Sequence, residues 1–244
     1  MFIAYVSFTF VTFLERIIIM LNKNILSICA IFLIGGLFAE GDAYPLIHCI
    51  VTGKDISHIK RPISYNYKGN DIKFFNMKAL KNFKRSAGKY MYKINEQIIK
   101  QQLAHYPMNK CVVSGELLDN HSINIVHKNR LVRLCCKGCV KDFKKKAKSY
   151  ITKLDNIVIH HQKPHYSLTH CVVMDDEALG GEMGEPIDFV HANRLIRFCC
   201  DGCIKKFRRN PSKFMKKIQH NHHHQNKEKH HKQNDHNHNH KHDH

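Results

Sequence analysis

The strongest constraint on the fold of this 244-residue chain is an internal repeat that occurs three times. The copies open with AYPLIHCIVTGKDI at Ala43, HYPMNKCVVSGELL at His105 and HYSLTHCVVMDDEAL at His165. A second block, VHKNRLVRLCCKGCVKDF in the middle copy, aligns in all three copies without gaps. Each copy spans about 55 residues, and a module of that size usually needs a metal, a disulfide or a neighbour. The repeat therefore predicts three modules, over residues 44–104, 105–164 and 165–219.

Within each copy the residue pattern changes from strand-like to helical. Ile123–Val126 and Leu131–Leu134 flank a short polar turn and predict a β-hairpin, which recurs at residues 187–190 and 195–198. Before it, Cys111-Val-Val and Cys171-Val-Val predict short strands that end in a turn, forming a knuckle. The predicted fold class is α+β, with three tandem modules of knuckle, hairpin and C-terminal helix after an N-terminal hydrophobic segment and before a tail.

The helix of each module is predicted by apolar residues that recur at steps of three and four. The stripes are Leu80, Phe83, Ala87, Tyr90, Met91 and Ile94; Val140, Phe143, Ala147, Tyr150, Ile151 and Leu154; and Ile204, Phe207, Pro211, Phe214, Met215 and Ile218. We interpret these stripes as core packing. In the third copy we expect Pro211 to break the helix near Asn210, and Ser212 to cap a short continuation.

Eight of the nine cysteines beyond residue 43 fall into two groups of four, in copies two and three. They are Cys111, Cys135, Cys136 and Cys139, and Cys171, Cys199, Cys200 and Cys203. In each copy, three segments converge where a strand is followed by a helix, whose N-terminal dipole and nearby basic residues lower thiol pKa values. The two-residue gap from Cys136 to Cys139 is typical of zinc sites, and thiolates also bind copper(I). We therefore predict a metal site in each of these two copies.

The number of cysteine ligands in each site stays open. Adjacent residues on a strand point to opposite faces, so Cys135 and Cys136 converge only if the chain bends between them. Without a bend, each site has three cysteines and an open or borrowed fourth position. His127 and His191 are candidate donors for that position, although each lies at a hairpin turn.

This arrangement resembles the TRASH and YHS-type modules, treble-clef-like relatives of zinc fingers associated with heavy-metal sensing, trafficking and resistance. Their pattern is a cysteine, some twenty residues, a cysteine, three residues and a cysteine. Here 23 residues separate Cys111 from Cys135, and 27 separate Cys171 from Cys199; Phe143, Phe207 and the NPSKF of residues 210–214 also match. The resemblance covers Tyr106 to about Ile218, and it implies metal binding by Cys111, Cys135 and Cys139 and by Cys171, Cys199 and Cys203.

The first copy is an internal control for the metal prediction. Phe75, Asn76 and Ala79 stand where the second copy has its three clustered cysteines, and only Cys49 remains. We expect residues 44–104 to form a degenerate module that replaces metal with apolar contacts, and Cys49 to be a buried or lone thiol.

Residues 1–43 are predicted to be a signal peptide or hydrophobic targeting segment, with a true start at Met20. Ile25–Ala39 is an apolar run after a short basic stretch, and cleavage after Ala39 or Ala43 fits the small residues there. Export would place the protein in a periplasm or cell envelope. A membrane anchor is the alternative.

Residues 220–244 form a tail with eleven histidines interleaved with polar residues. The tail has no apolar residue, which predicts disorder, and neutral imidazoles bind zinc, nickel and copper(II). The candidate ligands are His220, His222, His223, His224, His230, His231, His236, His238, His240, His242 and His244. A solvated tail without function and a purification tag are the alternatives.

These features predict an exported metal-ion-binding protein that handles or buffers zinc, with copper or nickel as alternatives. The formal net charge of +19 favours anionic surfaces in general, and we expect no specific nucleic-acid partner; a metal transporter or envelope protein is the expected kind of protein partner. No catalytic motif stands out, so we predict that the chain is not an enzyme. The competing interpretations are a disulfide-stapled envelope interaction protein and a basic zinc-finger nucleic-acid binder.

Overall fold

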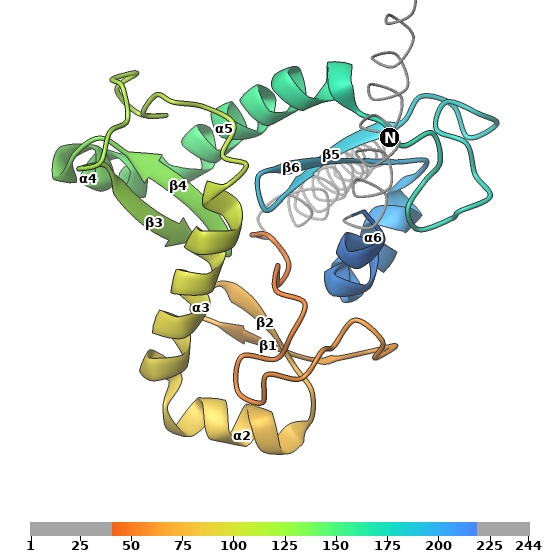
Figure 1. Cartoon of the computed structure of the whole chain (residues 1–244), viewed down its shortest axis with the longest axis horizontal. Coiled ribbons are helices and arrows are strands. Elements are labelled where there is room, and N and C mark those ends of the chain that lie inside the picture. The colour runs from red at the N-terminus through yellow and green to blue at the C-terminus, as the bar shows by residue number, and fades with distance from the viewer. Residues whose placement is uncertain (1–40, 219–244) are drawn as a thin grey trace, which may run out of the picture. The chain divides into compact units, whose positions relative to one another are not determined.

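The computed structural model describes residues 41–218, so the predicted targeting segment and the histidine-rich tail lie outside the described residues. The described part is mixed α+β, as predicted, and the same succession of elements recurs in each copy (Figure 1). The first copy contains β1 (Ile63–Tyr67), β2 (Asn70–Phe74), α2 (Met77–Arg85) and α3 (Ala87–Leu103). The second contains β3 (Ile123–His127), β4 (Arg130–Leu134), α4 (Lys137–Lys145) and α5 (Ala147–Gln162).

The third copy follows a short 3-10 turn, η1 (Lys163–His165). It contains β5 (Ile187–His191), β6 (Arg194–Phe198) and α6 (Asp201–Arg209), and residues 211–218 form a further helical segment. Residues 41–218 belong to one compact unit. Among them, no helix is long and apolar enough to cross a membrane.

Each copy contains one two-stranded antiparallel hairpin with a two-residue turn. In the second copy Ile123 pairs with Leu134 and His127 with Arg130, which leaves Lys128 and Asn129 at the turn. Both turn residues have positive φ, 46° and 69°, as do their counterparts in the other copies. Such turns match the right-handed twist of the strands. The hairpins of the second and third copies therefore form where the strand pattern predicted them.

The helix of each copy is divided in two at the same aligned residue, which corrects the expectation of one continuous helix in the first two copies. Ser86 separates α2 from α3 with φ −140° and ψ 44°, and Lys146 separates α4 from α5 with φ −129° and ψ 36°. The bend brings Phe83 and Tyr90 into a stacked contact, with ring centroids 6.1 Å apart. The equivalent pairs Phe143–Tyr150 and Phe207–Phe214 lie at 6.1 Å and 6.0 Å.

The predicted break at Pro211 is present, but its cap differs from the expectation. The side-chain oxygen Oδ1 of Asn210 accepts a hydrogen bond from the Lys213 backbone N–H at 3.4 Å, so Asn210 caps the following segment. The hydroxyl of Ser212 donates to the same oxygen. Asn210 is preferred because it stands directly before Pro211, and proline is well tolerated in the first helical position.

Glutamine side chains connect each copy to the next in the same way twice. Gln102, at the end of α3, donates to the Asn129 carbonyl at 3.0 Å and accepts from the Leu131 N–H at 2.8 Å. Gln162, at the end of α5, makes the same two bonds to Asn193 and Leu195 in the third hairpin, at 3.0 Å and 2.8 Å. Each helix end thus satisfies two backbone groups of the following hairpin.

The third copy also contacts the first. The Asn210 side-chain amide donates to the carbonyl of Ile59 at 2.7 Å, and Lys216 pairs with Asp55 at 3.1 Å. At the start of the described chain, both carboxylate oxygens of Asp42 bind Arg130 of the second copy, at 2.6 Å and 2.7 Å. One of these oxygens also accepts from the Ala192 N–H of the third copy at 2.6 Å.

Candidate metal centre

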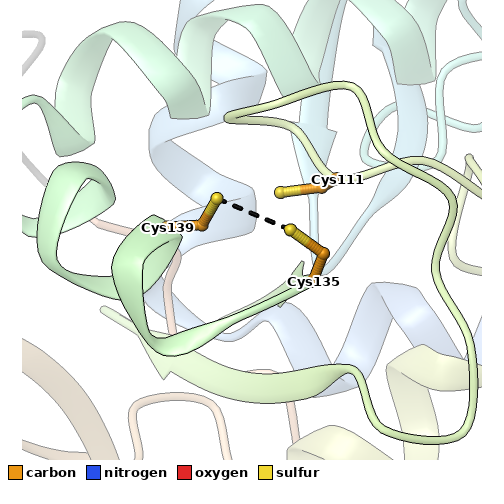
Figure 2. Close-up of side chains that lie close together, drawn as sticks. All are labelled: Cys111, Cys135 and Cys139. Carbon is orange, nitrogen blue, oxygen red and sulfur yellow. Dashed lines mark hydrogen bonds between the residues drawn. The ribbon is translucent and has the colours of Figure 1, made fainter.

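Three cysteine sulfurs converge in the second copy (Figure 2). Cys111 comes from the loop before β3, Cys135 from the end of β4, and Cys139 from the first turn of α4. Their sulfurs all lie within 4.8 Å of one another, and those of Cys135 and Cys139 are 3.6 Å apart. Three donors this close can bind a single metal ion.

Cys111 lies in a loop and not in the short strand we expected. A tight turn in this loop orients its sulfur toward the group. The preceding Lys110 makes an isolated bridge with Leu117, and the chain then reverses. The Cys111 N–H donates to the Glu116 carbonyl at 2.7 Å, while Gly115 donates back to the Cys111 carbonyl at 2.8 Å. The φ of Gly115 is +82°, a conformation that favours glycine. The knuckle is held by its backbone and leaves the thiol free to point inward.

The third copy builds the same group from Cys171, Cys199 and Cys203. All three are buried, and the sulfurs of Cys199 and Cys203 are 3.6 Å apart. The knuckle again begins at an isolated bridge, between His170 and Ala178, and the Cys171 N–H donates to the Glu177 carbonyl at 2.9 Å. The insertion between Cys171 and Cys199 therefore enlarges the loop and leaves the sulfur group intact.

Two cysteines of the second-copy group have pKa values shifted in opposite directions. Burial by itself raises the pKa of Cys111, but hydrogen bonds from Ser114 and from the Cys135 backbone lower this pKa to about 6. Burial raises the pKa of Cys139 to about 12, and the hydrogen bond to Cys135 adds to the effect. These shifts favour the thiolate form of Cys111 and the protonated form of Cys139. A bound metal ion would displace that proton, because metals bind thiolates.

The pKa values of the third-copy cysteines are also shifted in opposite directions. Burial raises the pKa of Cys171, but backbone N–H groups of Cys199, Val173 and Met174 outweigh burial and lower it overall. Burial raises the pKa of Cys199 to about 11 and also raises that of Cys203. Each group thus contains one cysteine with a lowered pKa and at least one buried cysteine with a raised pKa, and three sulfur donors fit a soft or borderline metal ion.

Cys136 and Cys200 are not members of the two groups. Each is the N-cap residue of the following helix, and Cys136 is exposed. The Cys200 sulfur lies 3.7 Å from that of Cys203 and 4.0 Å from that of Cys199. The backbone N–H groups of Cys139 and Cys203 lower the pKa values of Cys136 and Cys200 respectively. The described residues thus bring three cysteines together in each group, with the Cys200 sulfur beside the third-copy group.

The two histidines considered as fourth donors face aromatic rings. The His127 ring centroid is 5.3 Å from that of Phe143, and the His191 centroid is 5.0 Å from that of Phe207. Neither histidine belongs to a sulfur group. Burial lowers the pKa of His191 to about 4, and both of its ring nitrogens lack hydrogen-bond partners among the described residues. The two histidines therefore act as aromatic packing groups, because the hairpin turns lie beside the core phenylalanines.

The first copy has an apolar core where the other two copies have a sulfur group. Cys49 is buried, and it packs with Ala79 in a cluster that Phe75 also contacts. Ala79 and Phe75 align with Cys139 and Cys135. Apolar side chains thus occupy the positions of the missing sulfurs.

Sequence reasoning missed Ser114 as a neighbour of the second-copy sulfurs. Its hydroxyl lies 3.3 Å from the Cys135 sulfur, and its side chain lowers the pKa values of Cys111 and Cys139. The signal in the sequence is its place three residues after the first cysteine of the motif, within the turn that aims that sulfur.

Comparison with protein-family models, curated protein sequences and solved structures finds no match to this chain. The functional assignment therefore depends on the site itself.

Proposed function

We propose that this protein is an exported metal-binding protein that holds one metal ion at each of its two cysteine groups. One observation carries the proposal: three sulfurs from three separate segments converge within 4.8 Å, twice, at equivalent positions of a repeat. The copy without this group fills the same positions with apolar side chains. Zinc is the first candidate ion, with copper and nickel as alternatives, because thiolates bind soft and borderline ions.

The number of sulfurs favours metal binding over disulfide stapling. All nine cysteines among residues 41–218 are free thiols. A disulfide joins two sulfurs, so it leaves one of three converging cysteines unpaired, whereas a metal ion binds all three. The repeated group of three is therefore better explained by a metal.

The N-terminal segment and the tail complete the proposal, although both lie outside the described residues. The apolar run before Ala39 supports export, and the eleven tail histidines support a second, looser store of ions that releases metal as pH falls toward about 5–6. The cysteine motif is also the basis for proposing kinship with TRASH and YHS-type modules. In this scheme the tail captures ions and the modules retain them, as expected of a protein that buffers metal or confers resistance.

Metal stoichiometry tests the cysteine half of this proposal. The protein for the test is the full-length chain in which all eleven tail histidines are replaced by asparagine, which we call the Asn-tail chain. After loading with zinc and gel filtration, it should retain two ions per chain. Cys139→Ser and Cys203→Ser should each reduce this number to one, because each removes one ligand of one group.

The matched control is Cys49→Ala, which removes a buried cysteine of the ligand-less first copy. This variant should keep two ions. A folded Asn-tail chain that retains no zinc, copper or nickel would overturn the proposal. Titration of free thiols on freshly isolated protein separates it from the disulfide interpretation, which predicts fewer reactive thiols before reduction.

A further inference from the structure

The two cysteine groups differ in the residue that stands three positions after the first cysteine. This residue is Ser114 in the second copy and Met174 in the third. The backbone N–H of Ser114 lowers the pKa of Cys111, and that of Met174 lowers the pKa of Cys171. Both residues therefore occupy the same place in the knuckle, beside the same sulfur.

The second-copy group has one partly exposed cysteine and a hydroxyl beside it. The Ser114 hydroxyl lies 3.3 Å from the Cys135 sulfur, and its effects on the pKa values of Cys111 and Cys139 place it near all three sulfurs. Cys135 is itself partly exposed. An oxygen donor, from this hydroxyl or from water, has access to the group.

The third-copy group is buried and surrounded by apolar atoms. Cys171, Cys199 and Cys203 are 1%, 3% and 0% exposed and belong to the core of their copy. Met174 packs against that core with its thioether side chain. The described surroundings of this group therefore offer sulfur where those of the second-copy group offer oxygen.

The neighbouring N-cap cysteines add to this difference. Cys136 and Cys200 adopt nearly the same backbone conformation, with φ −153° and −158° and ψ 168° and 164°. The Cys200 sulfur lies 3.7 Å from that of Cys203 and 4.0 Å from that of Cys199, whereas Cys136 is exposed. The contrast between the two groups rests on Ser114, Met174, Cys200 and burial.

We propose that the two copies hold ions of different classes, with a borderline ion such as zinc in the second copy and a soft ion such as copper(I) in the third. This inference rests on the proposed metal-binding function. Zinc prefers four tetrahedral ligands and accepts oxygen as one of them. Copper(I) is selected by thiolates and thioethers, and the described side chains around the third-copy group supply sulfur donors.

Displacement of zinc by copper(I) tests the inference under anaerobic conditions. In the Asn-tail chain, Cys203→Ser leaves only the second-copy group, and Cys139→Ser leaves only the third-copy group. Each zinc-loaded variant is titrated with buffered copper(I), and the free copper(I) concentration that releases half of the zinc is measured. This concentration should be at least tenfold lower for the third-copy group.

Exchange of the two distinguishing residues is the second arm, and it is made in each of the two single-group variants. The double variant Ser114→Met, Met174→Ser should reduce the difference between the groups to less than threefold. A difference below tenfold between the unexchanged groups, or the reverse order, would overturn the inference while leaving the proposed function intact. Failure to load zinc at either group would instead overturn the proposed function.

Discussion

At the residue scale, the paired cysteines have separate roles. In the first copy, Asn76 is the N-cap of α2, and its side-chain oxygen accepts from the Ala79 N–H at 2.9 Å. Cys136 and Cys200 align with Asn76 and have the same extended conformation before their helices. The first cysteine of each pair joins the sulfur group, and the second occupies the cap position.

The variant Cys136→Asn tests this division of roles. Asparagine is among the best N-cap residues, so the free energy of unfolding should rise by about 1 kcal/mol, as measured by chemical denaturation. Zinc stoichiometry of the Asn-tail chain should stay at two. Loss of one ion in this variant would show that Cys136 is a ligand.

The sequence was sufficient to place six of these cysteines in two groups, but not to place the sulfurs of their neighbours Cys136 and Cys200. Strand alternation allowed either three or four ligands, because the direction of Cys136 depends on where β4 ends and α4 begins. Boundaries of that kind are set by tertiary packing and differ by one or two residues between methods. The sequence also did not predict the role of Ser114, since the position of its side chain depends on the conformation of the turn that contains it.

At the element scale, the connections between copies depend on single buried side chains. Gln102 is fully buried at the end of α3, and it satisfies one carbonyl and one N–H of the second hairpin. The alignment of Gln162 with Gln102 shows that this connection is part of the repeat. Buried backbone groups that lose their partners cost about 1–3 kcal/mol each.

Gln102→Leu should therefore lower the free energy of unfolding by about 2–4 kcal/mol, since the Asn129 carbonyl and the Leu131 N–H both lose their partner. The matched control is Gln101→Leu on the same helix, because the Gln101 side-chain oxygen is buried without a hydrogen-bond partner. The control should change stability by less than about 0.5 kcal/mol. Equal effects of the two variants in urea denaturation would contradict the role given to Gln102.

Hairpins and helical faces were predictable, whereas two of the three helix breaks were not. The strand pattern located the hairpins of the second and third copies, and Pro211 marked the break in the third copy. Ser86 and Lys146 carry no comparable local signal. Their breaks follow from packing at a distance, where Phe83 stacks on Tyr90 and Phe143 on Tyr150.

At the scale of the whole molecule, Asp42 joins the beginning of the described chain to two copies. Arg130 is 3% exposed and is held by both oxygens of Asp42 and by Asp155 at 2.7 Å. A buried charge that loses its main partner costs about 3–5 kcal/mol. Of the two cleavage positions suggested by the sequence, only cleavage after Ala39 keeps Asp42 in the mature chain.

A chain that begins at Tyr44 should therefore be less stable than one that begins at Glu40, by about 3–5 kcal/mol in the free energy of unfolding. Asp155→Asn in the longer chain is the control, and its effect should be smaller because Asp155 is 32% exposed. N-terminal sequencing of the exported protein should find Glu40 first. Equal stability of the two chains would remove the structural reason for preferring that site.

The central claim is that each cysteine group binds one ion through its three sulfurs. X-ray absorption at the zinc edge of the zinc-loaded Asn-tail chain measures the ligand atoms directly. The account predicts about three sulfur scatterers per zinc at ~2.3 Å, the usual zinc–thiolate distance. A first shell made of nitrogen and oxygen at ~2.0–2.1 Å, without sulfur, would contradict it.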